Sequence, residues 1–197
     1  MYGFEDLKEF FHEQDVNVII AADGETRSHA TVNHQLILKT PAGGVSVGFD
    51  ALARASHATY IARGKSADDQ RAVGRDGKVL IEHEKGVYTL KRLFLSERET
   101  HDYYFGYSNQ TLWPLCHVAF EKPVFNKDWY EGYTNVNRQF AEAIKAEIKP
   151  GKKNLVWIND YQLSLVPTYL GKRNDVAVGF FLAYSVADVG DLSDASS

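Results

Sequence analysis

Apolar residues recur every three or four positions between residues 127 and 148. An α-helix has about 3.6 residues per turn, so this spacing places the apolar residues on one face and predicts a long helix with one buried side. The helix is expected to end at Pro150 and Gly151, which do not continue a helix. The recurring residues are Trp129, Tyr133, Val136, Phe140, Ile144 and Ile148.

Short apolar runs rich in β-branched residues predict buried strands on either side of that helix. Further helices are expected over residues 4–12, 45–55 and 161–170. Because strands and helices alternate, the sequence predicts an α/β fold with a doubly wound sheet, whose ligands bind at the carboxyl ends of the strands. The predicted core strands cover residues 16–22, 59–62, 154–158 and 176–182.

Four other stretches have weaker patterns. Residues 34–38 predict a small strand, and residues 66–77 are charged and contain glycine, which is typical of a solvated loop. Residues 79–81 and 87–95 either pair as a hairpin or form separate strands. The small, polar and acidic residues 188–197 are expected to be disordered.

Composition narrows the class of protein. The chain has 197 residues, 44% of them hydrophobic and 24% charged, which suits one globular domain. A net charge of −4 argues against nucleic-acid binding, and no apolar run is long enough to span a bilayer. The start of the chain lacks a secretory pattern, and its single cysteine, Cys116, fits a reducing compartment. We therefore expect a cytoplasmic protein that binds neither nucleic acid nor membrane.

Residues 103–117 combine aromatic rings with amide and hydroxyl groups, a composition that suits a sugar and equally suits a protein core. Trp113 either stacks on a sugar ring or packs in the protein core. Asp160 follows a predicted strand and either binds a sugar hydroxyl or caps the next helix. Gly43 and Gly44 precede a predicted helix, where they either form a simple turn or bring backbone N–H groups close to a phosphate.

Several familiar kinds of site are missing from the sequence. The seven histidines show no metal-ligand spacing, so no metal site is expected. No nucleophile elbow, Walker loop or dinucleotide-binding glycine motif is present.

Four motifs occur in order along the chain. They are Gly43–Gly44, the Tyr-to-Trp-Pro-to-His pattern of residues 104–117, residues 135–141 (Asn-Val-Asn-Arg-Gln-Phe-Ala), and residues 157–167 (Trp-Ile-Asn-Asp-Tyr-Gln-Leu to Pro). Together these motifs resemble the trehalose-6-phosphate synthase family of retaining glycosyltransferases. The match covers roughly residues 16–182 and is similar to the N-terminal half of such an enzyme.

The resemblance implies a GT-B enzyme with two Rossmann-like domains that transfers glucose from UDP-glucose to glucose 6-phosphate without a metal or cofactor. It implies that Tyr104, Trp113 and Asp160 bind glucose 6-phosphate or a similar sugar phosphate, and that Gly43 and Gly44 lie near the donor phosphates. Residues 1–182 would then be the acceptor-side domain and residues 183–197 a divergent tail. The donor domain would be absent from the sequence, so we expect a truncated protein that is inactive alone and pairs with a chain carrying that domain.

The sequence departs from the family pattern at three places. Asp23 and Gly24 stand where the family has Asn-Arg, whose arginine grips the acceptor phosphate, and Arg27 lies close by as another source of positive charge. Ala183 replaces an active-site histidine, and Gln162 replaces the histidine of Asp-Tyr-His-Leu.

Two other functions are compatible with these departures. One is a non-catalytic domain that binds a sugar phosphate or a full-length synthase, and the other is a fragment of a glucosylglycerol-phosphate synthase.

Overall fold

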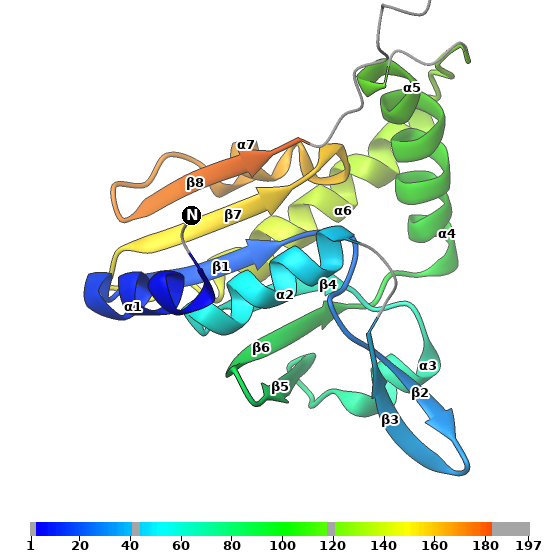
Figure 1. Ribbon diagram of the computed structural model, residues 1–197. Helices are drawn as coiled ribbons and strands as arrows, with labels where there is room; N and C mark the ends of the chain where they lie inside the picture. The colour runs from blue at the N-terminus through cyan, green and yellow to red at the C-terminus, as the bar shows by residue number, and fades with distance from the viewer. Residues whose placement is uncertain (1–2, 41–43, 118–120, 183–197) are drawn as a thin grey trace, which may run out of the picture.

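The computed structural model describes residues 3–40, 44–117 and 121–182, so Gly43, Ala183 and the predicted tail lie outside the described residues. The predicted α/β fold is confirmed: a six-stranded sheet in the order β5-β6-β4-β1-β7-β8 lies between layers of helices (Figure 1). All neighbouring pairs are parallel except β5 with β6, which form the hairpin. The strands are β1 (Asn17–Ala21), β4 (Thr59–Arg63), β5 (Lys78–His83), β6 (Gly86–Leu93), β7 (Asn154–Asn159) and β8 (Val176–Phe181).

The central strand β1 is completely buried, as its unbroken apolar run predicted. Val18 and Ile20 belong to the core on one face of the sheet, and Ile19 and Ala21 belong to the core on the other. This alternation follows from the two-residue period of a strand. Both faces must therefore be covered by helices.

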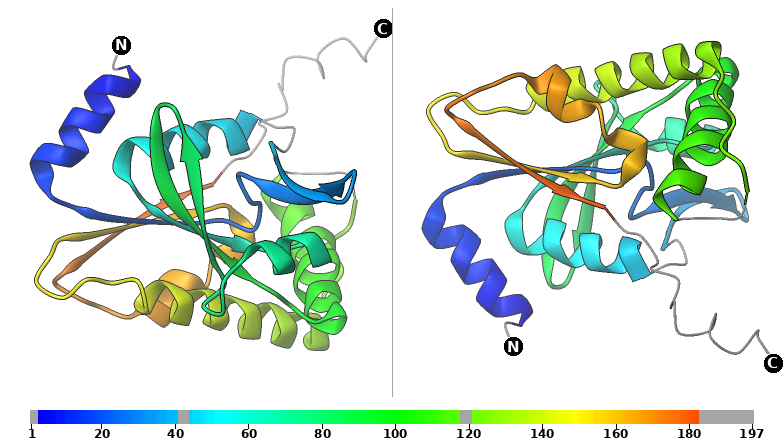
Figure 2. Two further views of the ribbon diagram at one scale, coloured as in Figure 1. Left: turned by 90° about the horizontal axis from the view of Figure 1, so that it is seen from below. Right: turned by 90° about the horizontal axis from the view of Figure 1, so that it is seen from above.

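The two helical layers cover opposite faces, as Figure 2 shows. Helices α1 (Phe4–Gln14) and α2 (Gly44–Ser56) cover the face of Val18 and Ile20. Helices α6 (Lys127–Lys145) and α7 (Val166–Leu170) cover the other face together with the helical residues 97–116. The apolar stripe that predicted α6 is buried at Tyr133, Val136, Phe140 and Ile144.

The order in which the chain adds strands to the sheet reverses at β1. The connection through α2 leads from β1 to β4 on one side, whereas the connection through α6 brings β7 to the other side of β1. Such a reversal opens a crevice at the carboxyl ends of the strands, where doubly wound proteins bind ligands.

A β-hairpin projects beside this edge of the sheet (Figure 1). Strand β2 (Ser28–Val32) pairs with β3 (Gln35–Lys39), so the small strand expected over residues 34–38 exists but has a partner that the sequence analysis missed. The two turn residues, Asn33 and His34, both have positive φ angles, which is typical of a tight two-residue hairpin turn.

Two predicted elements were wrong in detail. The expected loop over residues 66–77 contains helix α3 (Ala67–Ala72), because Ser66 and Asp69 form a reciprocal capping box at its start. The expected helix over residues 161–170 is divided into a 3-10 turn, Tyr161–Leu163, and α7. Pro167 lies in the first turn of α7, where proline is tolerated but would interrupt a longer helix.

Residues 97–116 form one helical stretch made of α4 (Glu97–Thr100), a π-helix (His101–Leu112) and α5 (Trp113–Cys116). The π-helix packs closely against α6 at two glycines. A Cβ atom added to Gly106 would lie 2.6 Å from Trp129 Cγ, and one added to Gly132 would lie 2.5 Å from Asp102 Cβ. These glycines therefore set the separation of the two helices.

We predict that Gly132→Ala destabilises the protein by about 1–2 kcal/mol, because overpacking costs about 1–3 kcal/mol and the better helix propensity of alanine returns up to about 1 kcal/mol. Urea unfolding measures the change in the free energy of unfolding.

Gly48→Ala is the matched control, since Gly48 lies within α2 and no atom lies within 4 Å of its added Cβ. It should leave the stability unchanged or raise it by up to about 1 kcal/mol. Equal effects of the two substitutions would contradict the close approach at Gly132.

Candidate functional site

Three charged residues meet at the carboxyl edge of the sheet. Asp23 follows the buried strand β1, Arg63 is the last residue of β4, and Asp160 directly follows β7. Because these parallel strands are neighbours, their ends lie side by side at the point where the strand order reverses. This is the position at which the sequence predicted a ligand site.

The π-helix directs both predicted aromatic residues toward this edge. Trp113 follows Tyr104 by nine residues, which is about two turns of a π-helix but two and a half turns of an α-helix. The wider helix therefore keeps the two side chains on one side. Trp113 is 40% exposed and Tyr104 is half-buried, so both remain partly accessible.

His117 and Tyr161 connect the aromatic residues to Asp160. The His117 ring stacks on Trp113 with the ring centroids 5.0 Å apart, and its edge meets the Tyr161 ring at 5.9 Å. Burial and the nearby Asp160 carboxylate raise the pKa of Tyr161, with smaller contributions from Tyr104 and Asp23. These seven residues, which we call the edge cluster, are Asp23, Arg63, Tyr104, Trp113, His117, Asp160 and Tyr161.

Asp160 has an unusual backbone conformation, with φ of 72° and ψ of 167°. This region is almost restricted to glycine and costs other residues of order 1–3 kcal/mol. The Asp160 N–H donates to the Phe181 carbonyl at 2.7 Å, and Asp160 Oδ1 accepts from the Tyr161 N–H at 2.9 Å. The capping role expected from the sequence is therefore present, and the strain marks Asp160 as a candidate functional residue.

Cys116 lies on the same side as this carboxylate. Burial, followed by the charge of Asp160, raises the pKa of the Cys116 thiol, which keeps the thiol protonated near neutral pH. Its chemistry is therefore that of a small, weakly polar side chain.

Arg63 and Asp23 form a buried, bidentate ion pair. Arg63 Nε and Nη2 donate to the two carboxylate oxygens of Asp23 at 2.8 and 3.0 Å. The guanidinium also lies over the Tyr104 ring, with its central carbon 4.6 Å from the ring centroid. Arg63 was not predicted as a site residue, although its place directly after the apolar residues 59–62 was a sequence feature that pointed to this edge.

Arg27 does not join the edge cluster. Its guanidinium donates to both carboxylate oxygens of Asp50, at 3.0 and 2.9 Å, and to the hydroxyl of Thr40. Asp50 also accepts from Tyr88 and Arg54. Arg27 therefore holds the segment after β1 against α2 and does not supply the free charge that its position in the sequence suggested.

Gly44, the described member of the glycine pair, lies at the same edge. Gly44 is the first residue of α2, which runs back from the carboxyl edge because it connects the parallel strands β1 and β4. The start of α2 therefore lies at the ligand edge of the sheet. That Gly43 and Gly44 approach the phosphates of a donor stays a prediction.

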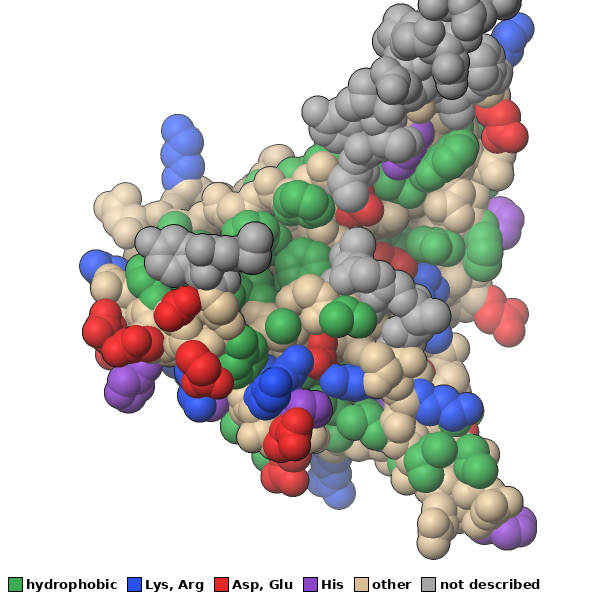
Figure 3. Space-filling view, in the orientation of Figure 1, with side chains coloured by type: hydrophobic (Ala, Val, Ile, Leu, Met, Phe, Trp, Pro, Cys, Tyr) green, Lys and Arg blue, Asp and Glu red, His purple; other side chains and the backbone are tan. Residues whose placement is uncertain are grey.

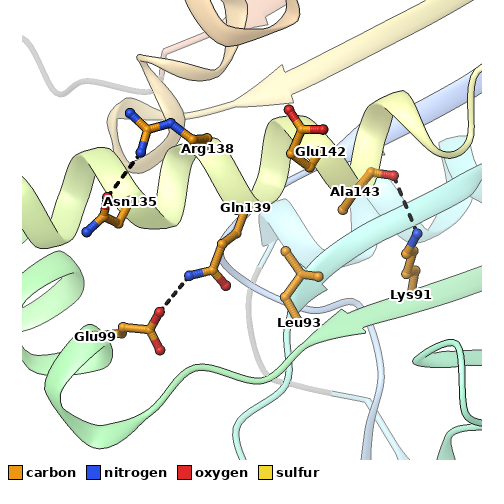
Figure 4. A pocket seen from close by; sticks show the side chains of 8 residues that line it. All are labelled: Lys91, Leu93, Glu99, Asn135, Arg138, Gln139, Glu142 and Ala143. Carbon is orange, nitrogen blue, oxygen red and sulfur yellow. Dashed lines mark hydrogen bonds between the residues drawn. The ribbon is translucent and has the colours of Figure 1, made fainter.

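The structure also contains a shallow pocket of about 650 Å³ on another side of the protein, between β6, α4 and α6 (Figure 4). None of the predicted site residues line it. Its polar side chains bond to one another or to neighbours: Gln139 donates to Glu99 at 2.6 Å, and Lys91 pairs with Glu147 at 2.7 Å. We therefore place the candidate site at the edge cluster.

Within the described ranges, no group of three or more His, Cys, Asp or Glu side chains is arranged to hold a metal ion. No helix among those residues is both long and apolar enough to cross a membrane.

The sequence model of glycosyltransferase family 20 matches residues 15–187. Trehalose-6-phosphate synthase of Mycolicibacterium vanbaalenii is 34% identical over 175 residues, which cover 85% of this chain and 31% of that protein. The enzyme of the same name from Mycobacterium avium strain 104 is 45% identical over 94 residues, covering 47% of this chain and 19% of that protein. This chain therefore spans about a third of the length of such relatives.

Solved structures agree with the fold. An α,α-trehalose-phosphate synthase (UDP-forming) from Burkholderia xenovorans, in complex with glucose-6-phosphate, superimposes with a TM-score of 0.58 at 22% identity. The match covers 84% of this chain and 33% of that chain.

The strain at Asp160 leads to a prediction about stability. Asp160→Gly and Asp160→Ala both remove the carboxylate, but only glycine adopts this backbone conformation without strain. We expect the glycine variant to be more stable than the alanine variant by about 1–2 kcal/mol, measured by urea unfolding.

Asp128, in the first turn of α6, provides the control. Asp128→Ala should be more stable there than Asp128→Gly, by up to about 1 kcal/mol, because alanine is the better helix former. The same order at both positions would show that Asp160 is not strained.

Proposed function

The chain belongs to glycosyltransferase family 20, and from this membership we propose that it supplies the sugar-acceptor side of a glucosyl transfer from UDP-glucose. The single observation that carries the proposal is the edge cluster, in which His117 and Tyr161 link Trp113 to Asp160 at the carboxyl edge of the sheet and Tyr104 lies near Tyr161. Residues 1–182 correspond in this proposal to the acceptor-side domain of the trehalose-6-phosphate synthases that the chain resembles.

The chemistry of the cluster suits a hexose. The exposed part of the Trp113 ring offers a flat apolar surface to the C–H groups of a sugar. The Asp160 carboxylate lies at the end of β7, where it can accept hydrogen bonds from sugar hydroxyls, which are stronger than bonds between neutral groups. Stacking and hydroxyl recognition together would fix both the face and the rotation of the ring.

The start of α2 is the proposed position for the donor phosphates. Helix N-termini carry unpaired N–H groups and a partial positive charge, which favour phosphate. Catalysis would then depend on holding acceptor and donor in line and on stabilising the departing UDP, with groups outside these 197 residues completing the donor site.

We predict that Trp113→Ala weakens hexose binding at least about tenfold, which corresponds to about 1.4 kcal/mol of lost contact. Isothermal titration of the purified chain with glucose and with glucose 6-phosphate measures the change, and ligand-observed NMR extends the range to weak binding.

Phe125→Ala is the control, because Phe125 is 72% exposed and makes no ring contact with the edge cluster. It should leave the affinities unchanged. Unchanged binding in Trp113→Ala, with binding by the parent chain established, would refute the proposed position of the sugar.

A further inference from the structure

Trp113 is the one exposed residue of the edge cluster. Its backbone is fixed at the start of α5, because the buried Pro114 follows it directly. Its indole, however, lies largely outside the packed core. A side chain that becomes ordered when a ligand binds loses rotamer freedom at that moment, which weakens binding. Whatever holds the indole in place before binding therefore affects the affinity for a sugar.

His117, one helical turn after Trp113, is held by two hydrogen bonds to a single atom. Its backbone N–H donates to the Trp113 carbonyl oxygen at 3.0 Å, and its ring Nδ1 lies 2.9 Å from the same oxygen. Since a carbonyl oxygen can only accept, Nδ1 carries the hydrogen in this contact. The two bonds together fix the orientation of the imidazole ring.

The imidazole contacts an exposed ring and a buried ring at once. It stacks on Trp113 with an angle of 22° between the ring planes and the centroids 5.0 Å apart. It meets Tyr161 nearly at a right angle, at 84°, with the centroids 5.9 Å apart. Tyr161 is 7% exposed, so this second contact ties the imidazole to the protein core. His117 therefore links the exposed indole to a firmly packed residue.

This arrangement has two consequences for a sugar. The stacked imidazole covers part of one indole face, which leaves the opposite face for the C–H groups of a hexose. The same contact restricts rotation of the indole before a ligand arrives, so less conformational entropy is lost on binding.

We propose that His117 is a positioning residue for the sugar: it holds the Trp113 indole in its stacking orientation and determines which indole face a hexose meets. The inference rests on the proposed function, because it concerns the sugar that the edge cluster binds. His117 acts through Trp113 and needs no contact with the sugar itself.

The experiment compares the parent chain with His117→Ala and His117→Phe in titrations with glucose and with glucose 6-phosphate. His117→Ala should weaken the binding of both about three- to tenfold, as expected when one side chain has to be ordered on binding. His117→Phe keeps a flat ring against the indole and should recover most of this loss. In a Trp113→Ala background, His117→Ala should have no further effect, because residues that act through one contact are not additive.

His101→Ala is the matched control. His101 is an exposed histidine at the start of the π-helix, and its ring meets a different tryptophan, Trp129, with the centroids 6.3 Å apart. Its removal should leave both affinities unchanged.

NMR relaxation of the indole N–H groups in the ligand-free chain gives a second measurement, with the Trp113 signal assigned from Trp113→Phe. Fast motion of the Trp113 indole should increase in His117→Ala and stay the same in His101→Ala.

Three results would overturn the inference and leave the proposed function intact, once sugar binding by the parent chain is established. They are unchanged affinities in His117→Ala, unchanged motion of the Trp113 indole in that variant, and an equal loss from His117→Ala with and without the Trp113 ring. If the parent chain binds neither sugar, the proposed function itself fails, and the inference fails with it.

Discussion

The need to pair buried polar groups governs the structure around the candidate site. Strand β1 is buried on both faces, so the residues that follow it begin inside the protein, where an unpaired charge is very costly. Asp23 therefore pairs with Arg63 of β4, Glu25 pairs with Arg92 of β6, and the hydroxyl of Thr26 bonds to that of Tyr88 at 2.7 Å. These contacts fix the edge of the sheet, and they pair the arginines of this region with carboxylates.

The second constraint is the close packing of the π-helix on α6. Gly106 and Gly132 let the two helices approach, and Asn137 of α6 in turn donates to the Gln162 carbonyl at 3.0 Å, just beyond Asp160. The aromatic residues and the strained carboxylate are thus held by one packed unit. A ligand at the edge cluster would meet a largely preformed surface, which reduces the conformational entropy lost on binding.

Strand β8, at one lateral edge of the sheet, differs in character from the carboxyl edge. Strand β8 carries no charged side chain, and its Val178, Phe180 and Phe181 are more than two-fifths exposed. Figure 3 shows hydrophobic side chains gathered on this face over β7 and β8. An exposed apolar strand at a sheet edge invites pairing with other strands.

The sequence by itself determined the elements whose patterns are local: the stripe of α6, the apolar runs of the core strands, and the four ordered motifs that indicated the family. It could not determine which distant residues meet. The pairing of Arg63 with Asp23 and of Arg27 with Asp50 depends on contacts between segments that lie apart in the chain. The conformation of Asp160 and the π-helical turn that aligns Tyr104 with Trp113 were likewise decided by packing, because local propensity favours neither. Residue types therefore predicted a sugar site, whereas the pairing of the charged groups at this edge follows only from the fold.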